Sequence, residues 1–193
     1  MIKPKKLNKG DKVALVSLSS GLFGDEANKA RLDRAINNLK NLLEIEPILM
    51  PNALIGSREV YEHPELRAKD LMDAFKDDSI KGIFTLTGGN DTIRILPYID
   101  FDVIRNNPKV FMGFSDTTAN HFMMYHAGLV SFYGPAAGVE FSLPEVPSID
   151  VETVKNTIFS VIRKETWYLS LYRNWIQAFD KKYKWFGGHF HSL

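Results

Sequence analysis

The sequence contains no cysteine, no excess of either charge and no long hydrophobic run. Without cysteine, disulfides and thiolate chemistry are excluded, which fits a reducing compartment. A formal net charge of +1 provides no general basic field for nucleic acid. No stretch approaches the roughly 20 apolar residues of a membrane span, and the run Val13–Leu18 is too short for a signal peptide. We therefore expect a cytoplasmic protein that binds neither nucleic acid nor membrane.

The composition is that of a globular protein. The 193 residues are 45 % hydrophobic and 24 % charged, and at roughly 100–200 residues per domain this length fits one domain with an appendage. The composition changes near residue 160. All three tryptophans and many other aromatic residues follow this position, and they recur with neither the helical nor the strand period. We expect a domain over residues 1–160 and an atypical aromatic-rich tail over residues 161–193.

Short apolar runs alternate with amphipathic stretches along the first 160 residues. The runs expected as strands are Lys12–Leu18, Glu46–Met50, Gly82–Leu86, Lys109–Phe114 and Leu129–Tyr133. The expected helices begin near Asp25, Pro64, Asp91, Ser115 and Ser148 or Asp150. This alternation predicts an α/β fold with a mainly parallel sheet between two helical layers. Such sheets bind ligands at the carboxyl ends of their strands, which directs attention to residues 19–21, 88–90 and 114–116.

The strongest chemical signal is the segment KVFMGFSDTT, residues 109–118. A serine at a sharp strand-to-helix turn exposes its hydroxyl at the sheet edge, where the next backbone N–H faces any oxyanion. Ser115 fits this nucleophile elbow, although Thr117 replaces the second glycine of the G-x-S-x-G pattern. The alternative interpretation is that Ser115 or Asp116 only caps the following helix.

A second turn, Thr87–Asp91, contains the paired glycines Gly88 and Gly89. Its backbone amides can converge on the same crevice, since glycines permit close approach of a ligand. The alternative is an ordinary loop with Asp91 as a helix cap. Neither a G-x-G-x-x-G fingerprint nor a P-loop is present, so we expect no nucleotide cofactor, and a flavodoxin-like nucleotide binder is disfavoured.

A serine nucleophile also needs a base, normally a histidine. His63 lies in a polar loop, and His121 and His126 follow the elbow at positions that point away from the helix start. His189 and His191 have a spacing that could suit a metal, but they lack supporting carboxylates. We assign no histidine as the base, and we expect no metal site.

Four segments of the chain resemble the N-terminal domain of the LD-carboxypeptidase family, in the family's order. This family is also called the muramoyltetrapeptide carboxypeptidases or serine peptidases S66, and it includes microcin C self-immunity peptidases. The matching segments are KLNKGDKVALVSLSSG (6–21), RAKDLMDAFKDDSIKGI (67–83), TGGNDTIRILPYIDFDVIRNNPKVFMGFSDTT (87–118) and NHFMMYHAGLVSFYGP (120–135). The expected fold is thus a flavodoxin-like, or class I glutamine-amidotransferase-like, three-layer sandwich.

The resemblance implies the roles of several residues and a substrate. The family's nucleophile falls on Ser115, and its oxyanion hole falls on the amides of Asp116 and of Gly88 or Gly89. Family members are cytoplasmic serine hydrolases that need no metal or cofactor and are commonly homodimers. They release terminal D-alanine from murein tetrapeptides during wall recycling, so the implied partner is a murein-derived or similar small peptide.

The chain departs from the family in one respect. The glutamate and histidine that complete the family's triad lie in a C-terminal domain, and we transfer neither role to this sequence. We expect an impaired or inactive enzyme. Two explanations of the departure compete: the chain is truncated or frameshifted near residue 160, or the tail replaces the C-terminal domain and supplies a base such as His189 or His191, or a partner surface. A non-catalytic peptide-binding module and a microcin C-type self-immunity peptidase remain as alternatives.

Overall fold

A computed structural model describes residues 1–160, which form a parallel sheet with the strand order β2-β1-β3-β4-β5. The strands are β1 (Lys12–Val16), β2 (Glu46–Leu49), β3 (Ile80–Thr85), β4 (Val110–Gly113) and β5 (Phe132–Tyr133). Each neighbouring pair is parallel. The expected mainly parallel sheet is therefore confirmed. The expected tail, 161–193, lies outside the described residues.

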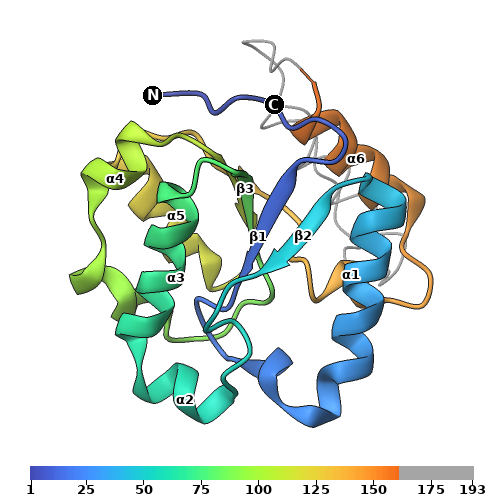
Figure 1. Ribbon diagram of the computed structural model, residues 1–193, viewed down its shortest axis with the longest axis horizontal. Helices are drawn as coiled ribbons and strands as arrows, with labels where there is room; N and C mark the ends of the chain where they lie inside the picture. The colour runs from blue at the N-terminus through green and yellow to red at the C-terminus, as the bar shows by residue number, and fades with distance from the viewer. Residues whose placement is uncertain (161–193) are drawn as a thin grey trace, which may run out of the picture. The chain divides into compact units, whose positions relative to one another are not determined.

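Helices cover both faces of this sheet. They are α1 (Lys29–Leu43), α2 (Ser57–Glu62), α3 (Pro64–Lys76), α4 (Phe101–Asn106), α5 (Thr117–His126) and α6 (Ser148–Ile158). Short 3₁₀ segments are η1 (Leu22–Gly24), η2 (Glu26–Asn28), η3 (Thr92–Tyr98) and η4 (Glu140–Ser142). Figure 1 shows α3, α4 and α5 on one side of the strands and α1 and α6 on the other. This confirms the expected three-layer α/β sandwich. Within residues 1–160, no helix combines the length and the apolar character that crossing a membrane requires.

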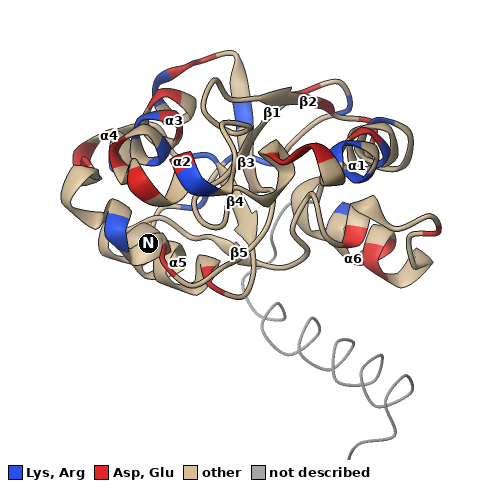
Figure 2. Cartoon of the chain, turned by 90° about the horizontal axis from the view of Figure 1, so that it is seen from below, with Lys and Arg blue, Asp and Glu red and all other residues tan. Residues whose placement is uncertain are grey.

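The core is the central part of the sheet and the helix faces that cover it. Residues Val13–Val16 of β1, Phe84 of β3 and Phe111 of β4 are fully buried, as expected for parallel strands with helices on both faces. In α1 the buried side chains are Leu32, Ala35, Leu39 and Leu43, which recur every three or four residues on one stripe. Figure 2 shows acidic and basic residues interspersed on the helices, around strands that carry few charges.

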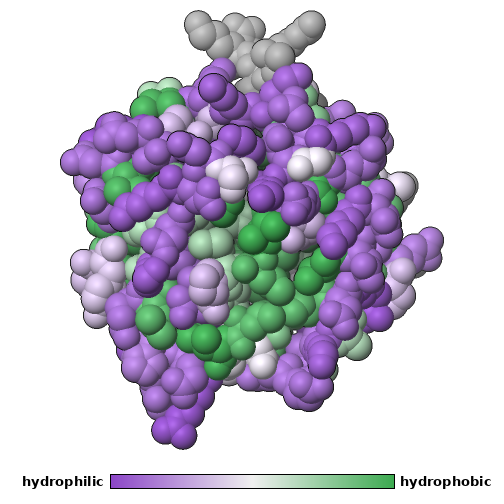
Figure 3. Space-filling view, in the orientation of Figure 1, coloured by the Kyte–Doolittle hydropathy of each residue, from purple (hydrophilic) through white to green (hydrophobic). Residues whose placement is uncertain are grey.

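The two edges of the sheet differ from its centre. Strand β2 has one neighbour and is only partly buried. Figure 3 shows the molecule in the orientation of Figure 1, in which β1 and β2 face the viewer. Hydrophobic residues gather in the middle of this face. At the other edge, the strand expected over 129–133 is only Phe132–Tyr133, because Leu129 forms an isolated parallel bridge with Ile2.

Two expected helix starts also differ in detail. The helix expected near Asp91 is the 3₁₀ segment η3, which contains Pro97, a residue with no N–H to donate. Helix α6 begins at Ser148, and its N-cap residue Pro147 makes no side-chain capping hydrogen bond. Ser148 and Asp150 therefore lie inside the helix rather than at its N-cap position. Both elements still occupy the places in the chain that the sequence predicts.

The strands contribute fully buried aromatic residues to this core, among them Phe84. We expect Phe84→Ala to lower the free energy of unfolding by about 3–5 kcal/mol, because it leaves a cavity between the sheet and its helices. The control is Phe122→Ala, at a side chain that is 70 % exposed, with an expected change of about 0.5 kcal/mol or less. Urea denaturation measures both, and equal losses in the two variants would contradict this description of the core.

Candidate active site

The loops after β1, β3 and β4 meet at the carboxyl edge of the sheet. In the order β2-β1-β3-β4-β5, the chain moves outward in opposite directions from β1 and β3, and ligands of such sheets bind at this switch point. A pocket of about 430 Å³ lies there, lined by Ser20, Ser57, Tyr61, Gly89, Asn90 and Asp91. The pocket adjoins the glycine turn that the sequence analysis selected.

Ser115 lies at the turn between β4 and α5, and its side chain is exposed. Its φ is 62°, which is strained for a residue with a Cβ. The turn is held on both sides: the N–H of Ser115 donates to Tyr133 Oη at 3.1 Å, and its carbonyl accepts from Thr118 N at 2.9 Å. Ser115 thus has the strained strand-to-helix geometry of a nucleophile elbow.

The turn of paired glycines packs directly against Ser115. A Cβ at Gly88 would lie 2.8 Å from Ser115 Cβ, 3.0 Å from its Oγ and 3.3 Å from the backbone N of Asp116, so only glycine fits there. A Cβ at Gly89 would overlap Ser19 Oγ. Within residues 1–160, the N–H groups of Gly88, Gly89 and Asp116 donate no hydrogen bond. They are therefore available to an oxyanion formed beside Ser115.

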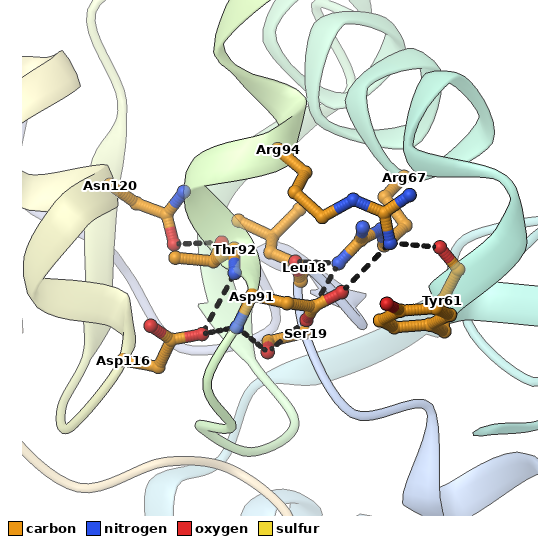
Figure 4. A network of polar contacts seen from close by, with 9 residues as sticks. All are labelled: Leu18, Ser19, Tyr61, Arg67, Asp91, Thr92, Arg94, Asp116 and Asn120. Atoms are coloured by element: carbon orange, nitrogen blue, oxygen red, sulfur yellow. Dashed lines mark hydrogen bonds and ion pairs between the residues drawn. The ribbon is translucent and has the colours of Figure 1, made fainter.

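The Asp116 carboxylate does not cap its own helix. Helix α5 begins at Thr117 without any side-chain cap, so the capping interpretation of Ser115 and Asp116 is wrong. Instead, Asp116 Oδ2 accepts the backbone N–H groups of Asp91 and Thr92, each at 2.9 Å (Figure 4). These N–H groups belong to the N-cap residue and to the first residue of η3, and a carboxylate there satisfies donors that have no partner inside the helix. The end of β4 and the turn after β3 are thereby joined.

Asp91 itself belongs to a buried ion pair. Its Oδ1 accepts from Ser19 Oγ at 2.7 Å and from Arg67 Nη1 at 3.1 Å. Arg67 Nη1 also donates to the carbonyl of Leu18 at 2.9 Å, and the Arg67 side chain is fully buried. Asp91 is the N-cap residue directly before η3, but its side chain makes no capping hydrogen bond there. The carboxylate therefore connects the loops of β1 and β3 to α3 (Figure 4).

Further contacts hold η3 from the outside. Arg94 Nη1 lies 3.6 Å from Asp91 Oδ2 and donates to the carbonyl of Tyr61. The Arg94 guanidinium also lies 4.4 Å from the centroid of the Tyr61 ring, a cation–π contact. On the opposite side, Thr92 Oγ1 donates to Asn120 Oδ1 at 2.9 Å. The segment after the glycine turn is thus fixed to α2, α3 and α5.

The histidine of α5 is committed elsewhere. His121 Nε2 lies 2.9 Å from the Gly113 carbonyl, which can only accept, so this nitrogen carries the proton. Nδ1 then accepts from Ser131 Oγ at 2.8 Å. Burial lowers the pKa of His121 and so favours the neutral form of the ring. Both nitrogens are used in positioning β4 against the β5 region, in agreement with a structural role.

The other histidines do not supply a base either. His63 Nδ1 lies 2.8 Å from Glu65, and this contact raises the pKa of His63. His126 packs edge-on against Phe101. None of the histidines in the described part of the chain is hydrogen-bonded to Ser115. His189 and His191 lie outside that part.

One group of side chains has the composition of a metal site. The ligand atoms of Glu59, Glu62 and His63 lie within 4.8 Å of one another, on and just after α2. The two glutamates are exposed, and His63 already pairs with Glu65. Exposed acidic groups of this kind are common without an ion, so this arrangement does not identify a metal site.

Sequence reasoning overlooked Arg67 and the role of Tyr133. Arg67 had one usable signal: it shares the stripe of α3 on which Leu71 and Phe75 are buried, at a spacing of four residues. A charged residue on such a stripe needs a buried partner. Tyr133 had no comparable signal, because its contact with Ser115 depends on how β5 lies beside β4.

The fold and the elbow define the class: an α/β protein with an exposed serine at a strained turn beside free backbone amides. Residues 13–134 match the family model described as the LD-carboxypeptidase N-terminal domain, Peptidase_S66. The chain therefore belongs to the S66 LD-carboxypeptidase family.

Relatives and solved structures agree with this membership. A Bacillus subtilis protein named "Probable murein peptide carboxypeptidase" is 34 % identical over 75 % of this chain and 44 % of its own length. The microcin C7 self-immunity protein MccF of Escherichia coli is 32 % identical over 61 % of this chain and 35 % of its own length. An MccF-like protein from Streptococcus pneumoniae, solved in complex with AMP, has a TM-score of 0.72 and 38 % identity, covering 77 % of this chain and 45 % of that one. The chain thus spans less than half the length of these relatives.

The Arg67 guanidinium is the main partner of the Asp91 carboxylate, and its removal leaves that carboxylate buried without this partner. We expect Arg67→Ala to lower the free energy of unfolding by about 3–5 kcal/mol. The control is Arg58→Ala, because Arg58 forms an ion pair with Glu62 while its side chain is 83 % exposed, and the expected loss is below about 1 kcal/mol. Urea denaturation compares them, and a loss at Arg67 no larger than that at Arg58 would show that the buried pair is not structural.

The two histidines predict opposite effects of pH on stability. Burial lowers the folded-state pKa of His121, so its contribution is present above the ordinary pKa of about 6.5 and is lost as the pH falls toward the folded value. Glu65 raises the pKa of His63, so that contribution is present at low pH and is lost as the pH rises through the raised value. The test is the urea midpoint of unfolding, measured at pH 7.5 and at pH 5. Between these two values the midpoint should fall less in His121→Gln than in the unmodified chain, and it should fall more in His63→Gln than in the unmodified chain. Equal pH dependence in all three proteins would contradict these assignments.

Proposed function

We propose that the chain carries the nucleophile of a serine-type LD-carboxypeptidase that releases terminal D-alanine from murein tetrapeptides. The observation that carries this proposal is the strained turn at Ser115, packed against Gly88 and next to the free N–H of Asp116. Membership of the S66 family and the similarity to a relative named as a murein peptide carboxypeptidase support the choice of substrate.

The chemistry follows from these positions. Ser115 Oγ attacks the carbonyl carbon of the bond to the terminal D-alanine, a C–O bond forms, and the carbonyl oxygen becomes an oxyanion. The N–H groups of Asp116 and of Gly88 or Gly89 stabilise that charge. The hydroxyl proton passes to a base and then to the leaving amine as the C–N bond breaks, and water hydrolyses the resulting ester.

Residues 1–160 provide no general base at Ser115. Members of a catalytic triad act as a unit, and without the base only binding and the oxyanion contacts remain, with a loss of several orders of magnitude in rate. This observation favours a second candidate, a non-catalytic module that binds peptides at the carboxyl edge of the sheet.

A third candidate is supported by the solved structures. The similarity to MccF, and to an MccF-like protein in complex with AMP, favours a self-immunity peptidase that acts on a peptide or aminoacyl group attached to a nucleotide. The pocket beside Gly89 lies next to the proposed oxyanion turn and could accept part of either substrate.

Release of D-alanine from a murein tetrapeptide by the full chain tests the first candidate. We expect slow release, measured by mass spectrometry of the free amino acid, and its complete loss in Ser115→Ala, because the attacking oxygen is removed. The control is Ser79→Ala, at an exposed serine just before β3, at the amino end of the sheet.

The other outcomes distinguish the candidates. Release that persists at an equal rate in Ser115→Ala would rule out Ser115 as the nucleophile. Cleavage of an aminoacyl sulfamoyl nucleoside, but not of the tetrapeptide, would replace the first candidate by the third. Binding of the tetrapeptide in calorimetry with no product from either substrate would establish the non-catalytic module.

A further inference from the structure

The Asp116 side chain has an unusual place in the candidate site. Its residue already belongs to the elbow, where its backbone N–H is one of the proposed oxyanion donors. Its carboxylate reaches across to the neighbouring loop, and a single oxygen, Oδ2, accepts the N–H groups of Asp91 and Thr92 at 2.9 Å each. One residue therefore belongs to both sides of the proposed oxyanion hole.

The two bonded N–H groups directly follow the glycine turn. Only Asn90 stands between the pair Gly88-Gly89 and Asp91. The bonds that hold Asp91 and Thr92 therefore also hold the carboxyl end of the turn. The far side of the same segment is anchored by Ser19 and Arg67, both bonded to Asp91 Oδ1. Without the Asp116 carboxylate, the turn would remain attached to β1 and α3. The bond from Thr92 Oγ1 to Asn120 Oδ1 would still link it to α5, but at a residue beyond the elbow itself.

The contact between Gly88 and Ser115 limits the opposite movement. The space for a Cβ at Gly88 is already occupied by Ser115, at 2.8 Å from its Cβ, so the backbone of the turn packs closely against the elbow and has little room to approach it further. The hydrogen bonds of Asp116 oppose movement away from it. The separation between the glycine amides and the Asp116 amide is thus bounded from both sides, as preorganised oxyanion donors require.

We propose that the Asp116 carboxylate is a positioning residue that sets the distance between the two halves of the oxyanion hole. This inference rests on the proposed function, because it assigns the amides of Gly88 or Gly89 and Asp116 to one oxyanion. In this role the Asp116 side chain does not contact the substrate. The carboxylate acts through the backbone of η3, so an acceptor oxygen at this position matters more than its charge.

The chain offers a matched control for this role. Asp100 Oδ1 accepts the backbone N–H groups of Asp102 at 3.0 Å and Val103 at 3.2 Å, at the start of α4. It makes the same two-bond pattern with a helix start, but on α4 rather than at the elbow. Asp116→Asn is the conservative variant, because its amide oxygen can still accept both N–H groups that Oδ2 accepts now.

The experiment compares the full chain with the variants Asp116→Ala, Asp116→Asn and Asp100→Ala. The first measurement is the rate at which a fluorophosphonate probe labels Ser115, with Ser115→Ala as the blank. We expect Asp116→Ala to reduce the rate on the order of 10- to 100-fold, since displacing a donor by about 1 Å has effects of this size. Asp116→Asn should retain most of the rate, and Asp100→Ala should label like the unmodified chain.

The second measurement is backbone amide hydrogen exchange by NMR, which does not depend on a reactive serine. Asp116→Ala should accelerate exchange at Asp91 and Thr92 and shift the amide resonances of Gly88 and Gly89, whereas Asp100→Ala should change none of these four signals. Unchanged Gly88 and Gly89 resonances in Asp116→Ala would overturn the proposal. An undiminished labelling rate in Asp116→Ala would also overturn it, as would a loss of labelling rate in Asp116→Asn equal to that in Asp116→Ala. If the unmodified chain is not labelled at all, the proposed function fails, and the exchange data alone decide the role of Asp116.

Discussion

The buried pairing of Arg67 with Asp91 is the interaction on which the carboxyl edge of the sheet depends. A guanidinium with no exposed surface needs acceptors, and here Asp91 Oδ1 and the Leu18 carbonyl both accept from Nη1 of Arg67. Its Nε and Nη2 have no hydrogen-bond partner among residues 1–160. Because Leu18 follows β1 and Asp91 follows β3, the pair fixes the two loops on either side of the switch point. Asp116 extends this connection to β4. Every group assigned to the candidate site lies on one of these three joined segments or packs against them.

Backbone strain also occurs at this edge. Apart from the helix end at Glu44, the non-glycine residues with positive φ in the described part of the chain are Ser20 and Ser115, each in a loop that follows a strand. A strained backbone persists only where the surrounding contacts hold it. At Ser115 these contacts are Tyr133, Thr118 and the packed face of Gly88. The rigid sheet thus presents an exposed hydroxyl in a defined direction, as a nucleophile requires.

Much of this arrangement was predictable from the sequence, and the remainder has a physical explanation. Apolar runs of strand length and the glycine and serine turns after them placed Ser115 and Gly88 at one edge, because parallel strands end together. The target of the Asp116 carboxylate was not predictable, since an aspartate at a helix start can accept N–H groups from its own helix or from a neighbour. Only the tertiary structure brings η3 close enough for the second choice. Likewise, the short β5 depends on the pairing of Leu129 with the N-terminal residue Ile2, which local sequence does not encode.

The central claim is that Ser115 and the amides of Gly88 or Gly89 and Asp116 form one site around a tetrahedral oxyanion. A crystal structure of the full chain after reaction with a peptidyl phosphonate tests it most directly. The account predicts a covalent bond from Ser115 Oγ to phosphorus, with one phosphonyl oxygen within about 3 Å of the Asp116 nitrogen and of a nitrogen in the glycine turn. An adduct on another residue, or a phosphonyl oxygen turned away from both amides, would contradict it.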